Sequence, residues 1–348
     1  MPSLVTTLML FNIALGTSLT LSSHHWLLAW VGLEINTLAV IPLMLAKSHP
    51  RSIEAALKYF LTQAAASALL LFSALINAWH TGEWSIHTLA DLPTNALTIA
   101  LMMKLGLVPT HFWMPEVIQG IPLHVGLIVL TWQKLAPMSI IIQSSHLLNL
   151  NLTIFLGLAS ILIAGWSGIS HNQLRKVLAF SSISHMGWTI IVLKLNPELA
   201  LFNFFVYVIM TTAAFATLIF INTTKFSELA TSFHENPHLA VTMTILLLSL
   251  AGMPPFLGFA PKFLISMELV QQEIIFLAAT TMVASMLSLF FYLRLSYILS
   301  QTMPPNMFCS PLLWRTTKNH PIICDLLNLL AIMTFPMVPS IVISMLPV

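Results

Sequence analysis

Long apolar runs separated by short polar clusters follow one another along the whole chain. A helix that crosses a bilayer needs about 20 mostly apolar residues. Breaks at proline, glycine and polar clusters divide the chain into about eleven such runs. Their approximate bounds are 3–22, 25–45, 55–79, 95–118, 123–145, 149–169, 174–195, 199–223, 238–270, 274–299 and 323–346. The pattern predicts an all-α fold, a polytopic membrane helical bundle of about eleven transmembrane helices.

Two of these runs contain a glycine–proline motif that predicts a broken helix. The run at 238–270 is too long for one span and contains Gly252-Met-Pro-Pro255. Gly106-Leu-Val-Pro109 lies in the fourth run. Because proline lacks an amide donor and crowds the carbonyl four residues earlier, we predict breaks at about 105–110 and 252–261.

The two motifs also match each other as an internal repeat. Both read G-x-x-P-x-x-x-x-x-P followed by Glu116 or Lys262, and their glycines, at 106 and 252, are 146 residues apart. Prolines recurring by chance would be the alternative explanation. The repeat predicts one membrane domain, 1–348, made of two inverted five-helix repeats at about 1–147 and 148–300 and an extra helix at about 323–346.

Positive charges favour one side of the predicted bundle. The loops after even-numbered helices hold Lys47, Arg51, Arg175, Lys176, Lys225, Arg315 and Lys318. The opposite loops hold Glu83, Asp91, Glu198 and Glu273, with Lys194 as their one clear cation. The positive-inside rule places the N-terminus on the positive side and, after an odd number of spans, the C-terminus on the other.

Composition supports a lipid environment and argues against several functions. Hydrophobic residues make up 57% and charged residues 7% of the chain, whereas soluble domains carry about 25% charged residues. A net charge of +2 makes nucleic acid an unlikely target. The two cysteines form no CxxC pair, and nucleotide, Walker and HExxH motifs are absent from the sequence. Since the first run leads directly into others, we expect a first span rather than a cleaved signal.

Four charged residues lie well inside apolar runs. They are Glu34, Lys104, Lys134 and Lys262. A charge at mid-bilayer costs about 2.5–3.5 kcal/mol on insertion scales, so such residues usually serve a function or have a partner. A structural ion pair is the alternative for each, but one carboxylate cannot neutralise three lysines. We therefore predict that these four groups transfer protons.

Three further residues are weaker candidates for a proton relay. His185 lies in the middle of a helix, beside serines that could bind its ring. His111 follows the first break and could bridge water between the half-helices. Lys58 lies near the start of the third helix, where its side chain could instead extend to the interface.

Several long strings carry a resemblance to a known family. The chain resembles, over its whole length, the antiporter-like membrane subunits of mitochondrial NADH:ubiquinone oxidoreductase, respiratory complex I. The strings are Trp30-Val-Gly-Leu-Glu34-Ile-Asn36, Lys104-Leu-Gly-Leu-Val-Pro-Thr-His-Phe-Trp-Met-Pro-Glu116, Gln173-Leu-Arg-Lys-Val-Leu-Ala-Phe-Ser-Ser-Ile-Ser-His185-Met-Gly187 and Gly252-Met-Pro-Pro-Phe-Leu-Gly-Phe-Ala-Pro-Lys262.

The resemblance implies a role for each buried charge. The family's glutamate on the second helix matches Glu34, its lysine on the first broken helix matches Lys104, its bridging lysine matches Lys134, and its terminal charged residue matches Lys262. Other members carry three more N-terminal helices, which we do not expect here. The implied location is the mitochondrial inner membrane, multi-pass, with the N-terminus in the matrix and the C-terminus in the intermembrane space.

The resemblance also implies a function within the respiratory chain. The chain would translocate protons along its Glu/Lys axis, coupled to quinone reduction, and would be an enzyme only as a subunit of NADH:ubiquinone reductase. NADH, flavin, iron–sulfur clusters and ubiquinone are expected in partner subunits, with no cofactor in this chain. The expected partners are other membrane-arm subunits and phospholipid, so a free monomer is not expected. The alternatives are a stand-alone cation/proton antiporter and a non-conducting scaffold subunit.

Overall fold

The computed structural model describes residues 3–46, 49–226, 228–229, 237–254, 256–301 and 322–333. These residues form α-helices and one short 3-10 helix, and no strand occurs within them. The chain divides into two compact units, which are described separately below. Unit 1 comprises Met1–Ser160 with Leu193–Pro197, and unit 2 comprises Ile161–Val192 with Glu198–Val348.

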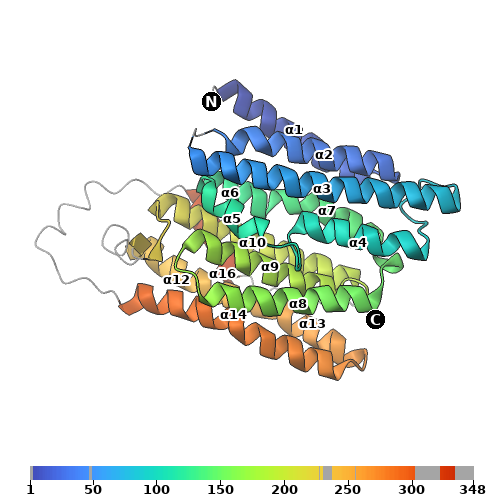
Figure 1. The fold of residues 1–348 in the computed structure, drawn as a ribbon. Helices are drawn as coiled ribbons and strands as arrows, with labels where there is room; N and C mark the ends of the chain where they lie inside the picture. Colours follow the sequence, from blue (N-terminus) through green and yellow to red (C-terminus); the bar gives the residue numbers. More distant parts are fainter. Residues whose placement is uncertain are drawn as a thin grey trace, which may run out of the picture. The chain divides into compact units, whose positions relative to one another are not determined.

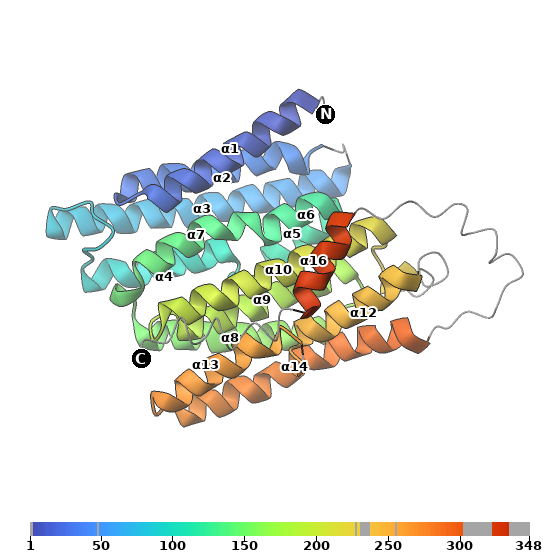
Figure 2. The ribbon, with the colours of Figure 1, turned by 180° about the vertical axis from the view of Figure 1, so that it is seen from behind.

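Unit 1 is built around three long neighbouring helices. Helices α1, α2 and α3 lie side by side in Figures 1 and 2. Helix α3 packs against α4 and α5, and α7 packs against α1, α2, α4 and α6. The bounds are α1 Ser3–Ser22, α2 Trp26–Met44, α3 Pro50–Thr81, α4 Asp91–Leu105, α5 Trp113–Gly120, α6 Leu123–Leu130, α7 Trp132–Gln143, η1 Ser145–Leu147 and α8 Leu150–Ile169, which continues into unit 2.

Two glycines allow α1 and α2 to approach closely. A Cβ added to Gly16 would lie 2.9 Å from the carbonyl oxygen of Gly32, and one added to Gly32 would lie 2.9 Å from that of Gly16. Small residues at a helix contact let backbones pack tightly in a membrane, where lipid offers no hydrophobic drive for association. This contact fixes the helix that carries Glu34.

Local signals explain the length and the buried face of α3. His49 accepts a hydrogen bond from the amide of Arg51, Pro50 occupies the first turn, and Gly82 ends the helix with a φ of 73°. These are strong start and stop signals. Tyr59 and Gln63, four residues apart, lie on its buried face. The helix therefore delivers two polar side chains to the interior of unit 1.

Unit 2 is arranged around α14. Helix α14 packs against α9, α12 and α13, and α12 also contacts α16. Figure 2 shows α12 and α13 following one another along α14. The bounds are α9 Leu174–Val192, α10 Pro197–Ile221, α12 Pro237–Ala251, α13 Phe259–Gln271, α14 Ile275–Gln301 and α16 Ile322–Met333.

Both predicted helix breaks are confirmed. Helix α4 ends at Leu105 and α5 begins at Trp113, while α12 ends at Ala251 and α13 begins at Phe259. Pro255, part of the second motif, lies outside the described residues. The fifth predicted run is also interrupted, at Thr131 between α6 and α7. The hydroxyl of Thr131 donates a hydrogen bond to the carbonyl of Leu127. Pro137 has no amide hydrogen and cannot bond to the turn before it. This segment therefore does not form one regular helix.

Seven helices of the described chain are long and apolar enough to cross a membrane. They are α1, α2, α3, the combined segment Leu123–Gln143, α8, α10 and α14. The other four predicted runs correspond to α4 with α5, α9, α12 with α13, and α16. Only 322–333 of the predicted final helix is described, so the total of about eleven and the inverted-repeat relation stay predictions.

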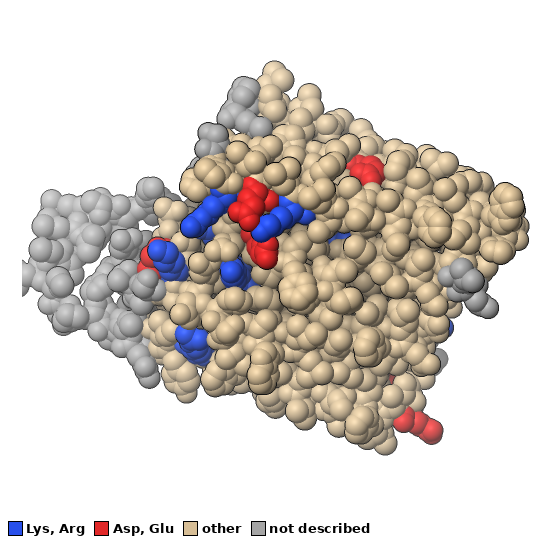
Figure 3. Space-filling model, viewed as in Figure 1, with Lys and Arg blue, Asp and Glu red and all other residues tan. Residues whose placement is uncertain are grey.

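The surface is suited to lipid. Figure 3 shows a face that is almost entirely uncharged, with its few charged side chains gathered in small areas. Large apolar side chains point outward on several helices, among them Phe11, Trp79, Phe155, Trp166 and Phe276. Without lipid or partner chains around them, such residues would not lie on a protein surface in this density. The predicted membrane class is confirmed.

Candidate functional site

The first helix break places a lysine at the C-terminal end of α4. Gly106 adopts a φ of 75° and its amide donates to the carbonyl of Met103, while Leu107 donates to Met102. This left-handed turn closes the helix. Lys104 lies in the last turn, where the negative end of the helix dipole favours a cation.

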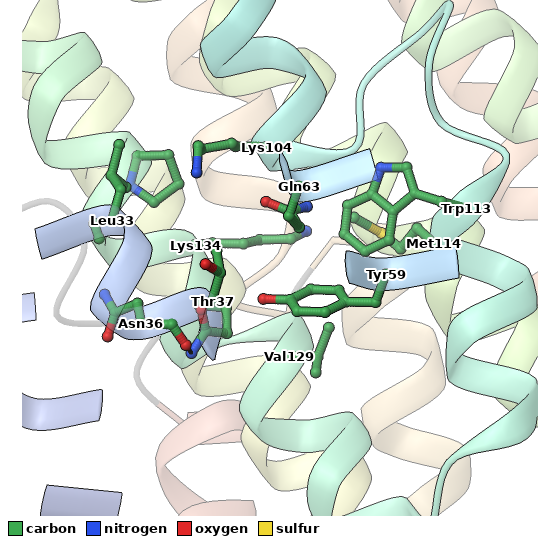
Figure 4. A pocket seen from close by; sticks show the side chains of 13 residues that line it. Leu33, Asn36, Thr37, Tyr59, Gln63, Lys104, Trp113, Met114, Val129 and Lys134 are labelled. Atoms are coloured by element: carbon green, nitrogen blue, oxygen red, sulfur yellow. Dashed lines mark hydrogen bonds between the residues drawn. The ribbon is translucent and has the colours of Figure 1, made fainter. Parts of the chain in front are cut away.

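A small cavity inside unit 1 brings Lys104 and Lys134 together. Its volume is about 20 Å³, and about 10–15 Å³ is enough to hold a water molecule. Figure 4 shows side chains from α2, α3, α4, α5, α6 and α7 surrounding it. Its lining consists of Leu33, Asn36, Thr37, Tyr59, Gln63, Lys104, Trp113, Met114, Val129, Gln133, Lys134, Ala136 and Pro137.

Both lysines are buried deeply. Lys104 is 6% exposed and Lys134 is 2% exposed. The Nζ atom of Lys104 makes no hydrogen bond to any residue that the structure describes. Because burial in a low-dielectric interior disfavours an ammonium ion, Lys104 can hold its charge only with help from the helix end, from nearby charges or from water in the cavity.

Among the described residues, Glu34 is the carboxylate that acts electrostatically on Lys104. It is half-buried on α2, and its Oε2 accepts a hydrogen bond of 3.0 Å from Thr37 of the same helix. Glu34 attracts Lys104 through space and also acts on Tyr59. The described chain contains no direct ion pair between Glu34 and Lys104. The two groups are therefore coupled electrostatically across a gap rather than locked together.

Lys58 and His111 lie in the same unit but do not line the cavity. Lys58 forms an ion pair of 2.5 Å with Glu54 of its own helix and one of 2.6 Å with Glu116, which joins α3 to α5. All three side chains are substantially exposed. His111 is buried in the break between α4 and α5, with its ring 4.2 Å from that of Phe112. Lys58 thus links α3 to α5, and the relay role of Lys58 and of His111 stays a prediction.

The second helix break, in unit 2, holds Lys262 differently. Gly252 ends α12 with a φ of 80°. Lys262, on α13, is 8% exposed, and its Nζ donates a hydrogen bond of 2.8 Å to the carbonyl of Ala251, the last residue of α12. The two half-helices are thereby joined by a lysine that binds a helix end.

His185 lies within unit 2 on α9, which packs against α13. It is buried, its ring centroid is 5.8 Å from that of Tyr207, and its backbone carbonyl accepts from Asn203. Ser181, Ser182 and Ser184 are buried on the same helix, and their hydroxyls donate to backbone carbonyls one turn earlier. These contacts fit either a relay or a satisfied core histidine.

Sequence reasoning missed the uncharged polar residues of the cavity. Asn36, Tyr59 and Gln63 are buried and line it, and both side-chain polar atoms of Asn36 lack a hydrogen-bond partner in the described chain. The available signal was the spacing of Tyr59 and Gln63, which puts both on one face of α3. Such unpaired polar atoms beside a cavity are suitable sites for bound water.

Within the part of the chain that the structure describes, no group of three or more His, Cys, Asp or Glu residues is placed to hold a metal ion. Two amines, a carboxylate, a phenol and three amides lie in or beside one small cavity. This combination can bind water and exchange protons.

Comparisons with known proteins match nearly the whole chain. Residues 23–288 match the family described as NADH:quinone oxidoreductase/Mrp antiporter, TM, and residues 289–342 match NADH dehydrogenase subunit 2 C-terminus. NADH-ubiquinone oxidoreductase chain 2 of Aquarana catesbeiana is 57% identical over 343 residues, which cover 99% of this chain and 100% of that protein.

Solved structures share the fold. A chain of respiratory complex I from Thermus thermophilus with bound aureothin superposes with a TM-score of 0.81 at 27% identity, over 95% of this chain and 79% of that one. A chain of the Mrp complex from Dietzia sp. gives a TM-score of 0.73 at 20% identity, over 83% of this chain and 59% of that one. The second likeness shows the fold alone.

Proposed function

From the premise that this chain belongs to the NADH-ubiquinone oxidoreductase chain 2 family, within the NADH:quinone oxidoreductase/Mrp antiporter proteins, we propose that it moves protons through its buried lysines. It does so as a membrane-arm subunit of the oxidoreductase complex. Proton movement is driven by quinone reduction elsewhere in the complex.

The cavity shared by Lys104 and Lys134 is the observation that carries the proposal. Two buried amines beside a space for water are expensive to maintain inside a membrane. A structural ion pair does not account for Lys104, because its Nζ binds none of the described residues, and among them Glu34 is the carboxylate that acts on it. An amine that can lose and regain a proton at this depth is suited to carry protons.

The charges suggest how a proton is released. Attraction from Glu34 stabilises the ammonium form of Lys104. When the Glu34 charge is neutralised or screened, that stabilisation is lost, and Lys104 can give its proton to water in the cavity. Lys134 lines the same cavity and accepts it. In unit 2, Lys262 carries the proton while bound to the end of α12.

The redox chemistry belongs to other subunits in this proposal. The sequence has no nucleotide-binding, flavin-binding or iron–sulfur motif. We assign NADH, flavin, iron–sulfur clusters and ubiquinone to partner subunits, and we place the chain in the mitochondrial inner membrane among other membrane-arm subunits and phospholipid. Loop charges place its N-terminus in the matrix and its C-terminus in the intermembrane space.

The test is Lys104→Ala in the assembled complex, reconstituted in vesicles. We expect assembly and NADH binding to stay normal, while the number of protons moved per electron falls and coupled turnover slows. Lys225→Ala, at an exposed lysine, is the control and should behave like the wild type.

Three other outcomes would contradict the proposal in distinct ways. A normal proton-to-electron ratio in Lys104→Ala, with normal turnover, would mean that this lysine carries no protons. Normal ratios for Lys104→Ala and Lys134→Ala alike would indicate a non-conducting scaffold. Cation/proton exchange by the purified chain alone would indicate a stand-alone antiporter.

A further inference from the structure

Gly252 and Lys262 are in direct contact at the second helix break. A Cβ built on Gly252 would lie 2.8 Å from Nζ of Lys262, 3.0 Å from its Cδ and 3.1 Å from its Cε. The lysine side chain thus runs across the bare Cα of Gly252 and ends at the carbonyl oxygen of Ala251, 2.8 Å from Nζ. Any side chain at position 252 would occupy the path that the lysine takes.

The backbone turn at Gly252 also presents the acceptor. The amide of Gly252 donates to Ser249 and that of Met253 to Leu248. The left-handed turn thus provides hydrogen bonds for the carbonyls of Leu248 and Ser249. The last carbonyl of a helix has no hydrogen-bond donor within the helix. The carbonyl of Ala251 is therefore available at the negative end of the helix dipole, where a cation is favoured.

We propose that Gly252 is a positioning residue for Lys262, and that its missing side chain is what seats the ammonium on the end of α12. The inference rests on the proposed role of Lys262 in proton transfer. It goes further by naming the feature that fixes where the amine lies. Gly252 touches no proton itself and acts only through the lysine.

Adding a methyl group here would disturb the lysine more than the fold. The atoms that a new Cβ would meet are Cδ, Cε and Nζ, the far end of a flexible side chain. They can move away at little cost to packing. Moving them takes Nζ off the Ala251 carbonyl, so the amine loses its one hydrogen bond among the described residues.

The chain offers a matched control in Gly82. It also ends a helix with a left-handed φ, of 73° against 80° at Gly252, so alanine meets the same backbone strain at both positions. A Cβ at Gly82 would have no atom within 4 Å, whereas at Gly252 it meets Lys262. Any difference in proton transfer between Gly252→Ala and Gly82→Ala therefore measures the effect of the contact with Lys262, because both variants carry the backbone strain.

The experiment compares Gly252→Ala, Gly82→Ala and Lys262→Ala in the assembled complex. Assembly, electron transfer and protons moved per electron are measured in vesicles. We expect Gly252→Ala to slow proton transfer about tenfold, as misplaced groups commonly do, with assembly and uncoupled electron transfer unchanged. Gly82→Ala should stay within about twofold of the wild type. A cryo-EM map of Gly252→Ala should show Nζ of Lys262 beyond hydrogen-bond distance from Ala251.

Each result supports or overturns the inference. If Lys262→Ala loses pumping and Gly252→Ala matches Gly82→Ala, the positioning role is wrong and the proposed function stands. Normal pumping in Lys262→Ala overturns the role of the lysine and the inference with it. If Gly252→Ala lowers assembly while each assembled complex pumps normally, the glycine serves the fold only, which also overturns the inference.

Discussion

At the first helix break the lysine precedes the left-handed glycine, and at the second break the lysine follows it. Lys104 lies in the last turn of α4, two residues before Gly106, whereas Lys262 lies in the first turn of α13, after Gly252. Their hydrogen bonding differs accordingly. Nζ of Lys262 binds a backbone carbonyl, and Nζ of Lys104 binds no described residue. The same interruption of a helix thus produces two environments for an amine.

Side chains and a cavity surround the amine of Lys104, whereas the backbone end of a helix binds the amine of Lys262. Around Lys104 lie a cavity, polar side chains and the charge of Glu34, all of which can change with hydration or protonation. Around Lys262 no carboxylate of the described ranges acts on the amine. We therefore expect the first site to respond to substitution of its neighbours, and the second to respond to changes in backbone geometry.

The largest effect is expected from Lys134→Met, which keeps the length of the side chain and removes the amine. Lys134 is buried beside Lys104, so proton transfer through this chain should fall about 100-fold. The control is Thr280→Val, at the position that the predicted repeat matches to Lys134 (134 + 146 = 280), where the hydroxyl donates to Leu277 of its own helix. Proton-to-electron ratios would be measured, and equal losses in both variants would contradict the asymmetry between the two sites.

The second prediction concerns charge coupling and uses double-mutant cycles. Glu34→Gln and Lys104→Met should be coupled by about 0.5–3 kcal/mol in transition-state free energy, because the two charges attract each other. In unit 2, Glu268→Gln and Lys262→Met should be additive within about 0.5 kcal/mol, since Glu268 does not act on the lysine. Turnover rates give the coupling. Additivity in the first cycle would remove Glu34 from the mechanism.

A smaller effect is expected from uncharged residues near the breaks. Gln63→Leu replaces a buried amide in the cavity wall, which should weaken water binding and slow proton transfer about three- to tenfold. Ser249→Ala is the counterpart at the end of α12. Its hydroxyl donates to Leu246 within the helix at 2.8 Å and has a weaker contact of 3.8 Å with the Met210 sulfur on α10, so we expect a change below about twofold. If Ser249→Ala had the stronger effect, the second site would also depend on side chains.

The sequence predicted the two helix breaks and the two buried lysines, but it did not predict what each lysine contacts. Glycine and proline predicted both breaks, because their backbone properties act locally. Charges in apolar runs predicted Lys104 and Lys262, because lipid makes such residues costly wherever they lie. The interruption at Thr131 was missed, since its deviation involves one turn of an otherwise helical segment.

The pattern of apolar and polar residues could not predict contacts between residues of different helices. Whether a lysine ends on a carbonyl or in a cavity depends on its rotamer and on neighbouring helices. Lys262 returns to Ala251, eleven residues earlier, only because Gly252 leaves room. Tyr59 and Gln63 are polar residues on an amphipathic helix, and their sequence does not reveal that they meet Lys104 and Lys134. Nor does the sequence reveal that Glu34 acts on Lys104 while the Nζ atom of that lysine binds no described residue.

The smallest effect is expected from Lys58→Ala, which removes the partner of the residue that the predicted repeat matches to Lys262. By register that position is Glu116, since 116 + 146 = 262, and Glu116 is paired with Lys58. Lys58 is 41% exposed and Glu116 is 50% exposed, so this pair lies at the periphery, unlike the buried Lys262. Exposed ion pairs usually contribute little, and Glu54 and Glu116 need no buried partner once Lys58 is gone.

We therefore expect Lys58→Ala to change protons moved per electron by less than about twofold, with assembly close to normal. Glu54→Gln serves as the matched control, because it weakens the same cluster while leaving the Lys58–Glu116 bond of 2.6 Å in place. If Lys58→Ala slowed proton transfer as strongly as Lys104→Ala while Glu54→Gln did not, Lys58 would belong to the proton pathway through Glu116. The first unit would then use a peripheral ion pair where the second uses the end of a helix.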